Sequence, residues 1–288
     1  MSTAVNDDPR LGALVVPGEV GDIVVVGFPS DEGVKRNGGR PGGPEAARKH
    51  LMKVGPLVNP EFGIDLRGLK IVDAGDIAVP TLEEGHESLA STVGKIIGHG
   101  GIPFVIGGGN DQSYPNARGL LAHVPSGSMA AINIDAHFDV RPLKEGKVHS
   151  GSPFRLLIED DRFQGEHFVE FASQGNQCSA VHAQYITEHK GKIVWLSDIK
   201  KRCEAIFVSF DIDSIKSSDC PGVSAPGAVG LTSEDALEIC FVSGKNPKVR
   251  LVDLSEYNPL VEEYRTGRLV ATMFYYFAMG VASRYAKP

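Results

Sequence analysis

The stretch Ala131-Ile-Asn-Ile-Asp135-Ala-His137-Phe-Asp139 decides both the fold and the chemistry expected of this chain. A short apolar run, typical of a buried strand, ends in two carboxylates and an imidazole. Because side chains alternate along a strand, Asp135, His137 and Asp139 are expected on one side, and an apolar core cannot hold such a trio unpaired. A divalent cation is the simplest partner for them.

A second stretch, Phe207-Val-Ser-Phe-Asp211-Ile-Asp213, repeats the pattern with two more carboxylates on one side. A single Asp-x-Asp on a loop is usually a solvated turn, so alone it would be a weak signal. Two such endings, each after an apolar run, are far more specific. Together they predict a binuclear metal centre.

The composition is that of an ordinary globular protein, with 288 residues, 42% hydrophobic and 23% charged. A formal net charge of −7 argues against a nucleic-acid surface and offers no polybasic membrane anchor. No apolar run approaches the ~18 residues that span a bilayer. The first eight residues lack the basic region of a secretory signal, and the four cysteines form no CxxC pair. We therefore expect a cytoplasmic or other intracellular protein that is not secreted, with no nucleic-acid or membrane partner.

Short β-branched runs alternate with helical stretches, which is typical of a parallel sheet covered by helices on both faces. We expect residues 1–21 to be a loosely attached tail and residues 22–288 to form one α/β domain, a three-layer α/β/α sandwich with about eight parallel strands. The predicted strands are Ile23–Phe28, Lys70–Asp73, Pro103–Ile106, Ala130–Ile134, His167–Ala172, Lys192–Leu196, Ala205–Phe210 and Val249–Leu254. The predicted helices are Pro44–Val54, His86–Gly98, Ser113–His123, Ser179–His189, Ser233–Phe241 and Gly267–Ser283, with Ser179 and Ser233 as N-caps.

One predicted connection is too short for this architecture. About eight residues separate the strand that ends near Leu196 from the strand that begins near Ala205, whereas a parallel crossover needs a dozen or more. Either a helix is missing there or the two strands are not joined directly. We favour missing residues.

Ligands of an open α/β sheet gather at the carboxyl ends of its strands, and the polar clusters of this chain follow predicted strands. These clusters occupy residues 29–40, 107–113, 135–141, 211–213 and 255–259. The candidate ligands are mostly carboxylates with one imidazole and no thiolate, which favours a hard cation such as Mn²⁺ over tetrahedral zinc. Two such ions can share a water, lower its pKa and supply hydroxide near neutral pH.

The two strand endings resemble the DAHxD and SxDxD signatures of the arginase, or ureohydrolase, superfamily. Residues 219–227, Asp-Cys-Pro-Gly-Val-Ser-Ala-Pro-Gly, are similar to the DPxxxPG segment of that family, and Gly43-Pro44-Glu-Ala-Ala-Arg48 is similar to its early GPxAxR element. The resemblance runs from about Val24 to the C-terminus. It implies the arginase fold, two Mn²⁺ per subunit, hydrolysis of a guanidinium or amidine C–N bond, and a homo-oligomer, commonly a trimer or hexamer.

The resemblance also implies a ligand set. Asp135 and Asp211 would bridge both ions, and Asp139 would complete the first site. His137 and Asp213 would bind the second ion. Asn110 stands where the family has a histidine ligand to the first ion. A neutral amide oxygen donates less strongly than imidazole, so this site should be weaker.

Further roles follow from the same resemblance. Asp111 would orient Asn110 as an outer partner. His149 matches the position that carries protons near the metal-bound hydroxide, and Glu256 matches the acidic residue that pairs with the cationic amidinium. We expect solvated or structural roles for the remaining histidines considered: His86, His123, His167, His182 and His189.

The basic residues near these motifs point to an acidic substrate. Arg141 would repel a cationic amine and can bind a carboxylate through two hydrogen bonds. Lys35, Arg36 and Arg40 are either further substrate contacts or solvated loop charges. A small amidine with two carboxylates, N-formimino-L-glutamate, fits this inventory, and the segments around Arg141 and His149 resemble formiminoglutamases more than arginases.

That branch implies a role in histidine degradation, with glutamate and formamide as products. Two alternatives stay open. One is an arginase, agmatinase or guanidinobutyrase that releases urea. The other is a catalytically silent relative, for which Asn110 is the only support.

Overall fold

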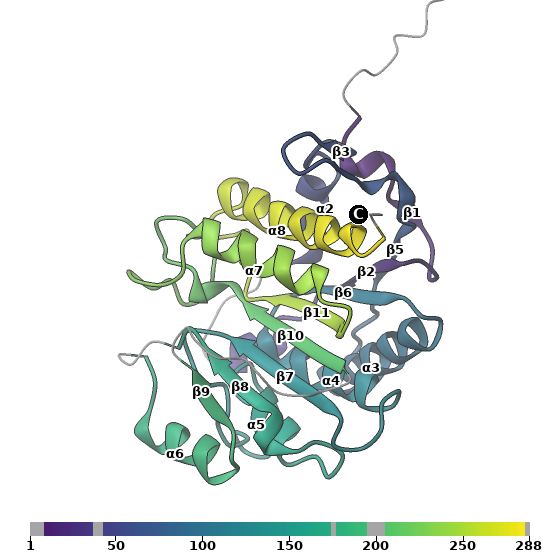
Figure 1. The fold of residues 1–288 in the computed structure, drawn as a ribbon. Coiled ribbons are helices and arrows are strands. Elements are labelled where there is room, and N and C mark those ends of the chain that lie inside the picture. Colours follow the sequence, from purple (N-terminus) through teal and green to yellow (C-terminus); the bar gives the residue numbers. More distant parts are fainter. Residues whose placement is uncertain (1–8, 37–42, 174–176, 195–204, 286–288) are drawn as a thin grey trace, which may run out of the picture.

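The computed structural model describes residues 9–36, 43–173, 177–194 and 205–285. Its centre is a nine-stranded parallel sheet with the strand order β1-β5-β2-β6-β11-β10-β7-β8-β9 (Figure 1). The strands are β1 (Val16–Pro17), β2 (Ile23–Phe28), β5 (Ile71–Asp76), β6 (Ile102–Gly107), β7 (Met129–Ile134), β8 (Phe168–Phe171), β9 (Lys192–Val194), β10 (Ala205–Asp211) and β11 (Val249–Ser255). A separate short hairpin pairs β3 (Val58–Asn59) with β4 (Ile64–Asp65).

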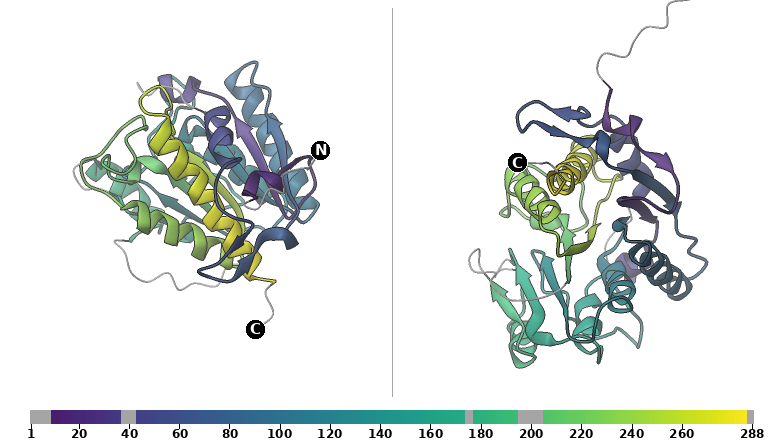
Figure 2. Two further views of the ribbon diagram at one scale, coloured as in Figure 1. Left: turned by 90° about the horizontal axis from the view of Figure 1, so that it is seen from above. Right: turned by 45° about the vertical axis from the view of Figure 1, so that its right-hand side comes forward.

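Helices cover both faces of this sheet, which confirms the three-layer α/β/α sandwich (Figure 2). The helices are α1 (Glu32–Arg36), α2 (Pro44–Leu51), α3 (Leu82–Gly98), α4 (Ser113–Leu121), α5 (Pro153–Ile158), α6 (Ala180–Glu188), α7 (Ser233–Lys245) and α8 (Tyr264–Ser283). The two faces build two cores because successive strand residues point to opposite sides. In β2, Ile23 and Val25 join the core under α2, α7 and α8, whereas Val24 and Val26 join the core under α3, α4, α5 and α6.

All eight predicted strands are present, and the ninth, β1, lies inside the segment expected to be a loose tail. Leu11 is completely buried, and Val16 and Pro17 pair in parallel with Val72 and Asp73 of β5. The expectation of a loosely attached segment is therefore wrong for the described residues from Pro9 onwards. A strand of two residues that contains a proline has no periodicity by which to recognise it.

The helix starts agree with the sequence to within a few residues. Pro44 occupies the first turn of α2, and Ser179 is the N-cap of α6. The N-cap of α7 is Thr232 rather than Ser233. Its hydroxyl accepts the backbone N–H of Asp235, and the Asp235 carboxylate accepts the backbone N–H of Thr232 in return.

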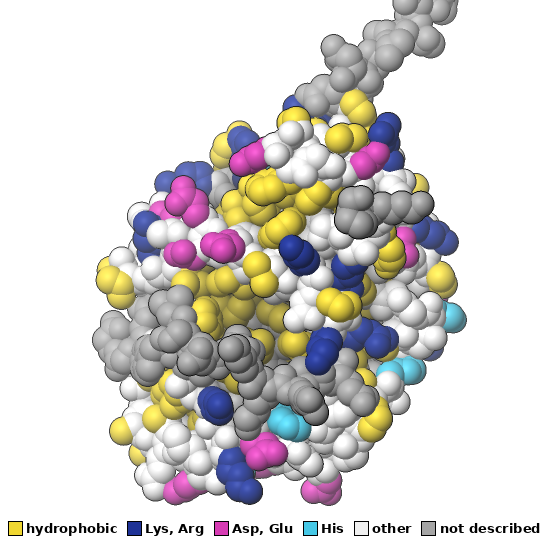
Figure 3. All heavy atoms as spheres, in the orientation of Figure 1, with side chains coloured by type: hydrophobic (Ala, Val, Ile, Leu, Met, Phe, Trp, Pro, Cys, Tyr) yellow, Lys and Arg dark blue, Asp and Glu magenta, His cyan; other side chains and the backbone are white. Residues whose placement is uncertain are grey.

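One face of the sheet is incompletely covered by the described residues. Helix α7 packs over β10 and β11, but beside it a groove of about 490 Å³ lies over β7 and β8. Its walls include Ile132, Phe171, Val208 and Val242, and hydrophobic side chains gather in the centre of this view (Figure 3). Strands β9 and β10 are separated in the sheet by β8 and β7. The segment for which we favour missing residues, 195–204, lies outside the described residues.

None of the described helices combines the length and the apolar character needed to cross a bilayer.

Candidate metal centre

Two neighbouring strands bring the candidate ligands together. β10 pairs in parallel with β7, and Phe210 lies opposite Ile134, so Asp211 and Asp135 emerge side by side at the carboxyl end of the sheet. Both carboxylates are buried. A short 3₁₀ turn after β10, Ile212–Ser214, carries Asp213 back over the same edge.

The two strand endings share a local geometry that explains their spacing. In each, a carboxylate accepts the backbone N–H two residues later, from His137 to Asp135 Oδ1 at 2.8 Å and from Asp213 to Asp211 Oδ1 at 3.1 Å. After β7 the chain turns sharply, because Asp139 has a φ of 40°, a left-handed conformation that aspartate tolerates better than most residues. These turns direct several side chains towards one point.

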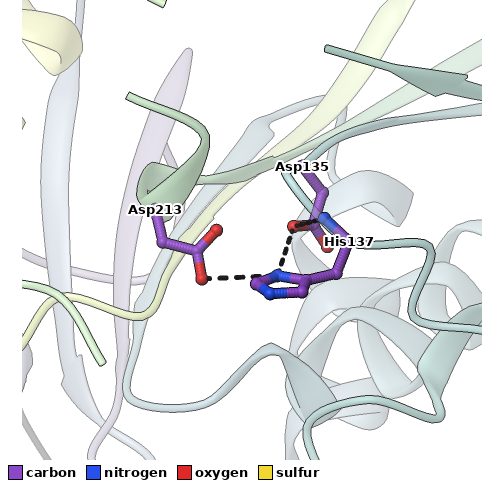
Figure 4. A group of neighbouring side chains, drawn as sticks. All are labelled: Asp135, His137 and Asp213. Atoms are coloured by element: carbon purple, nitrogen blue, oxygen red, sulfur yellow. Dashed lines mark hydrogen bonds and ion pairs between the residues drawn. The ribbon is translucent and has the colours of Figure 1, made fainter. Parts of the chain in front are cut away.

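The side chains form two potential ligand groups that share Asp135. The first contains Asp135, Asp139 and Asp211, and the second contains Asp135, His137 and Asp213. Within each group the ligand atoms lie within 4.8 Å of one another. In the second group, His137 Nδ1 is 3.3 Å from Asp135 Oδ1 and 3.6 Å from Asp213 Oδ2 (Figure 4). Each of the five expected carboxylate and imidazole ligands belongs to one of these groups, and Asp135 is shared by both, whereas Asp211, also expected to bridge the ions, belongs to the first group.

The electrostatics of the cluster fit a bound cation. Burial and the neighbouring negative charges raise the pKa values of Asp139, Asp211 and Asp213 well above the usual range. Burial alone would lower the pKa of His137, but its hydrogen bond to Asp135 and the surrounding carboxylates raise it to about 10. Asp213 Oδ1 is buried without a hydrogen-bond partner. A divalent cation would offset the mutual repulsion of these buried acids and favour their ionised forms.

Asn110 does not face the cluster as a ligand. Its Nδ2 donates to Asp139 Oδ2 at 2.8 Å, and its Oδ1 accepts from Ser113 Oγ at 2.6 Å and Ser255 Oγ at 3.3 Å. An ionised carboxylate only accepts hydrogen bonds, so beside an ionised Asp139 the amide nitrogen faces the acid and the amide oxygen faces the hydroxyls. The expected coordination through the amide oxygen is therefore corrected, because Asn110 holds a ligand rather than acting as one.

Asp111 does not orient Asn110 as expected. Its Oδ2 lies 2.8 Å from His86 Nε2, and both side chains are buried. His86 therefore has the structural role expected of it, because its buried pair with Asp111 joins α3 to the loop after β6.

A cavity of about 250 Å³ opens over the cluster. It is lined by His137, Asp139, Asp211 and Asp213, by Arg141 and Glu256, and by Val34, Ser150, Ser224 and Ala225. Glu256 has a left-handed φ of 65°, and its backbone N–H donates to Gly108 O at 2.8 Å. Its carboxylate accepts the backbone N–H of Asn110 at 3.0 Å, and burial raises its pKa to about 7. Arg141 and Glu256 thus lie where a substrate above the metal ions would be held.

His149 is not brought to this cavity. Its Nε2 donates to Pro142 O at 3.1 Å, and its Nδ1 accepts the backbone N–H of Gly151 at 3.2 Å. Both ring nitrogens are therefore hydrogen-bonded, one as donor and one as acceptor, which is the pattern of a neutral imidazole. Burial lowers the pKa of this ring. Ser150 lines the cavity instead. The role of His149 as a proton carrier is corrected for this arrangement and would require its ring to leave Pro142.

Of the other basic candidates, the described residues Lys35 and Arg36 do not line the cavity. Arg36 pairs with Glu32 at 3.1 Å and donates to Val148 O at 3.0 Å, so it fastens the loop before His149. Lys35 is exposed and lines a separate hollow beside α1. Arg40 lies outside the described residues. For Lys35 and Arg36 this placement favours the alternative of loop charges over substrate contacts, and Arg141 is the basic residue that the described structure places at the cavity.

Sequence reasoning overlooked two buried acids close to the centre, Glu170 on β8 and Asp253 on β11. Asp253 accepts hydrogen bonds from Ser209 at 2.7 Å, Ser113 at 2.9 Å and Asn116 at 3.0 Å. The signal was available, since each acid lies directly between two apolar residues of its strand.

The fold and the two ligand groups define a class: an α/β enzyme whose binuclear metal centre lies at the carboxyl ends of its strands. The sequence profile of the arginase family matches residues 21–280. This chain belongs to the arginase family.

Individual proteins of known name are similar to this chain over most of its length. Formimidoylglutamase of Rhodococcus jostii is 30% identical over 283 residues, covering 89% of this chain and 85% of that protein. The structure of Trypanosoma cruzi formiminoglutamase with Mn²⁺ has 47% identity and a TM-score of 0.90, covering 96% of this chain and 100% of that one. An asparagine-to-histidine variant of that enzyme, also with Mn²⁺, has 48% identity and a TM-score of 0.92, covering 97% of this chain and 100% of that one.

Proposed function

We propose that this protein is a manganese-dependent hydrolase that cleaves N-formimino-L-glutamate to L-glutamate and formamide. The observation that carries the substrate assignment is Arg141, which lines the cavity together with the acidic side chains. The similar proteins named formimidoylglutamase or formiminoglutamase support the same substrate.

The residues that would hold Mn²⁺ are the two groups already described. Asp135 would serve both ions, with Asp139 and Asp211 on one and His137 and Asp213 on the other. Bound as a pair, such ions lower the pKa of a water between them and supply hydroxide near neutral pH. The chain's own task is then to orient the amidine carbon over the centre and to exclude other substrates.

Two residues of the cavity fit the two ends of the substrate. The Glu256 carboxylate can accept the N–H groups of an amidinium, and burial of this acid in the cavity strengthens that interaction. Arg141 can hold a substrate carboxylate through two parallel hydrogen bonds. The same positive charge would repel the free amine of agmatine, which argues against agmatine among the urea-releasing substrates.

The test is a substrate panel with metal-free protein reloaded with Mn²⁺. We expect formamide from formiminoglutamate and no urea from arginine, agmatine or 4-guanidinobutyrate. Asp211→Ala is the inactive control, because it removes a ligand. Urea release would favour the guanidine-hydrolysing alternative. A protein that binds little Mn²⁺ and releases neither product would be the catalytically silent relative.

A second variant tests the substrate contact alone. Arg141→Met keeps an unbranched side chain but loses the charge, so we expect kcat/KM for formiminoglutamate to fall by about 10- to 100-fold, the equivalent of a hydrogen bond to a charged group. Mn²⁺ affinity should stay native. An unchanged kcat/KM would show that Arg141 does not bind the substrate.

A trimeric or hexameric assembly and an intracellular location stay predictions. Light scattering coupled to size exclusion would test the first.

A further inference from the structure

A row of buried polar side chains crosses four adjacent strands one step below the metal ligands. Glu170 on β8 lies opposite Asn133 on β7, Asn133 opposite Ser209 on β10, and Ser209 opposite Asp253 on β11. All four are completely buried. Because side chains alternate, the residues two positions further along β7 and β10, Asp135 and Asp211, lie on the same side. The row is therefore the layer on which the centre rests.

Glu170 stands out in this row because the described structure gives it so little compensation. Its one hydrogen bond comes from Asn133 Nδ2 to Oε2 at 3.0 Å, and Oε1 is buried without a partner. No described lysine or arginine pairs with it. Burial, followed by the charges of Asp135 and Asp139, raises its pKa well above the usual range. An apolar side chain would suit the strand Phe168–Phe171 better, so packing does not account for this acid.

Asn133 connects Glu170 to the metal centre. Its single amide nitrogen lies 3.0 Å from Glu170 Oε2 and 3.2 Å from Asp135 Oδ2. Both carboxyl oxygens accept from this nitrogen, so the two amide hydrogens are divided between them and the amide group is held in one orientation. If Glu170 offered no acceptor, one hydrogen would be left unpaired in a buried site. The amide could then turn its oxygen towards Asp135.

Asp135 is the ligand for which orientation matters most, because both ligand groups contain it. Its Oδ1 accepts the backbone N–H of His137 at 2.8 Å, and its own N–H donates to Phe171 O at 3.0 Å. The bond from Asn133 fixes its second oxygen. A carboxylate that serves two ions needs both oxygens aimed, so a change in this bond affects both sites.

We infer that Glu170 is a positioning residue that, through Asn133, aims Asp135 and so sets the affinity of the centre for its metal ions. The inference rests on the proposed function only in that the centre binds Mn²⁺. It concerns metal binding and needs no particular substrate.

The experiment is calorimetric titration of Mn²⁺ into metal-free protein. We expect Glu170→Leu to weaken binding by about 10- to 100-fold, as loss of an outer hydrogen-bond partner does at other metal sites. Glu170→Gln keeps an acceptor for Asn133 and should bind with near-native affinity. Glu166→Gln is the matched control, since it makes the same change in an exposed side chain of the same segment.

A double variant tests the route through Asn133. If Glu170 acts only through this amide, Glu170→Leu adds no further loss to Asn133→Leu. Losses that multiply would overturn the inference, as would native affinity in Glu170→Leu. Glu170→Met is a second apolar replacement, and failure of both to fold would also overturn the inference by showing that the acid is needed for the fold. Absence of Mn²⁺ binding by the native protein would instead refute the proposed function.

Discussion

Replacing Asp253 by asparagine should change the pH dependence of folding in a way that the structure allows to be estimated. Asp253 is completely buried on β11, and burial raises its pKa from the ordinary 3.8 to about 6 in spite of the hydrogen bonds from Ser209, Asn116 and Ser113. The unfolded chain would therefore release this proton at a lower pH than the folded protein does.

The direction in which the free energy of unfolding changes with pH follows from the number of protons that each state binds. Between pH 3.8 and about 6 the folded state holds a proton that the unfolded state has lost, so the free energy of unfolding falls as the pH rises. Above about pH 6 both states are ionised and the loss is complete. A shift of about two pKa units corresponds to about 3 kcal/mol in total, of which about 2 kcal/mol falls between pH 4.5 and pH 7.5.

Asparagine has the shape of aspartate but does not titrate. The hydrogen bonds lost in the variant lower the free energy of unfolding by a similar amount at both pH values, so this contribution cancels when the two values are compared. We therefore expect the effect of Asp253→Asn on the free energy of unfolding to be about 2 kcal/mol more favourable at pH 7.5 than at pH 4.5. Urea unfolding of chelator-treated protein, followed by circular dichroism, measures both values.

An exposed aspartate supplies the control. The Arg67 side chain lowers the pKa of Asp65 to about 2, so this acid is ionised in the folded protein at both pH values. Asp65→Asn should show no gain at the higher pH. An equal effect of Asp253→Asn at pH 4.5 and pH 7.5 would refute the reasoning, because it would mean that Asp253 keeps its ordinary pKa when buried.

Two further changes have clear expected outcomes. Asn110→His should retain turnover and bind Mn²⁺ more tightly in calorimetry, because an imidazole can supply the ligand that the amide does not, and lost activity would show that the amide has another role. Gly280→Ala should lower the free energy of unfolding by about 1–3 kcal/mol in urea, because the added carbon would overlap the carbonyl oxygen of Phe241 where α8 crosses α7, and an unchanged midpoint would show that the helices can separate without cost.

The parts of the site that follow from local rules could be predicted from the sequence. Strand alternation and the i to i+2 hydrogen bond fix how Asp135 and His137 leave β7, and the same rules apply to Asp211 and Asp213 after β10. These contacts involve neighbouring residues, so spacing alone specifies them. The eight longer strands were predictable for the same reason, since each contains its own apolar run.

The parts that depend on distant partners could not be predicted. The direction of the Asn110 amide is set by Ser113 and Ser255, which come from α4 and β11. The ring of His149 is turned by the carbonyl of Pro142 on the opposite side of a loop. A side chain with two possible faces takes the one that its neighbours can pair, and the sequence does not state which neighbours those are.

Two of the metal ligands are oriented in the same way, by hydrogen bonds from buried amides that other buried groups hold in place. Asp139 and Asp135 each accept a hydrogen bond from a buried asparagine, at 2.8 Å from Asn110 and at 3.2 Å from Asn133. Glu170 holds the Asn133 amide directly.

The other amide is held through a hydroxyl. Ser113 Oγ lies 2.6 Å from the oxygen of Asn110 and 2.9 Å from Asp253 Oδ2, and its single hydrogen serves one of these acceptors at a time. Ser209 and Asn116 also donate to Asp253, at 2.7 Å and 3.0 Å, so Asp253 can spare the Ser113 hydrogen for Asn110. A histidine at position 110 would thus add a ligand to the metal centre, but the hydrogen bond from the Asn110 amide to Asp139 would be lost. At position 110 this chain therefore has a residue that orients a ligand in place of the family's histidine ligand, and this replacement does not imply that a metal site is lost.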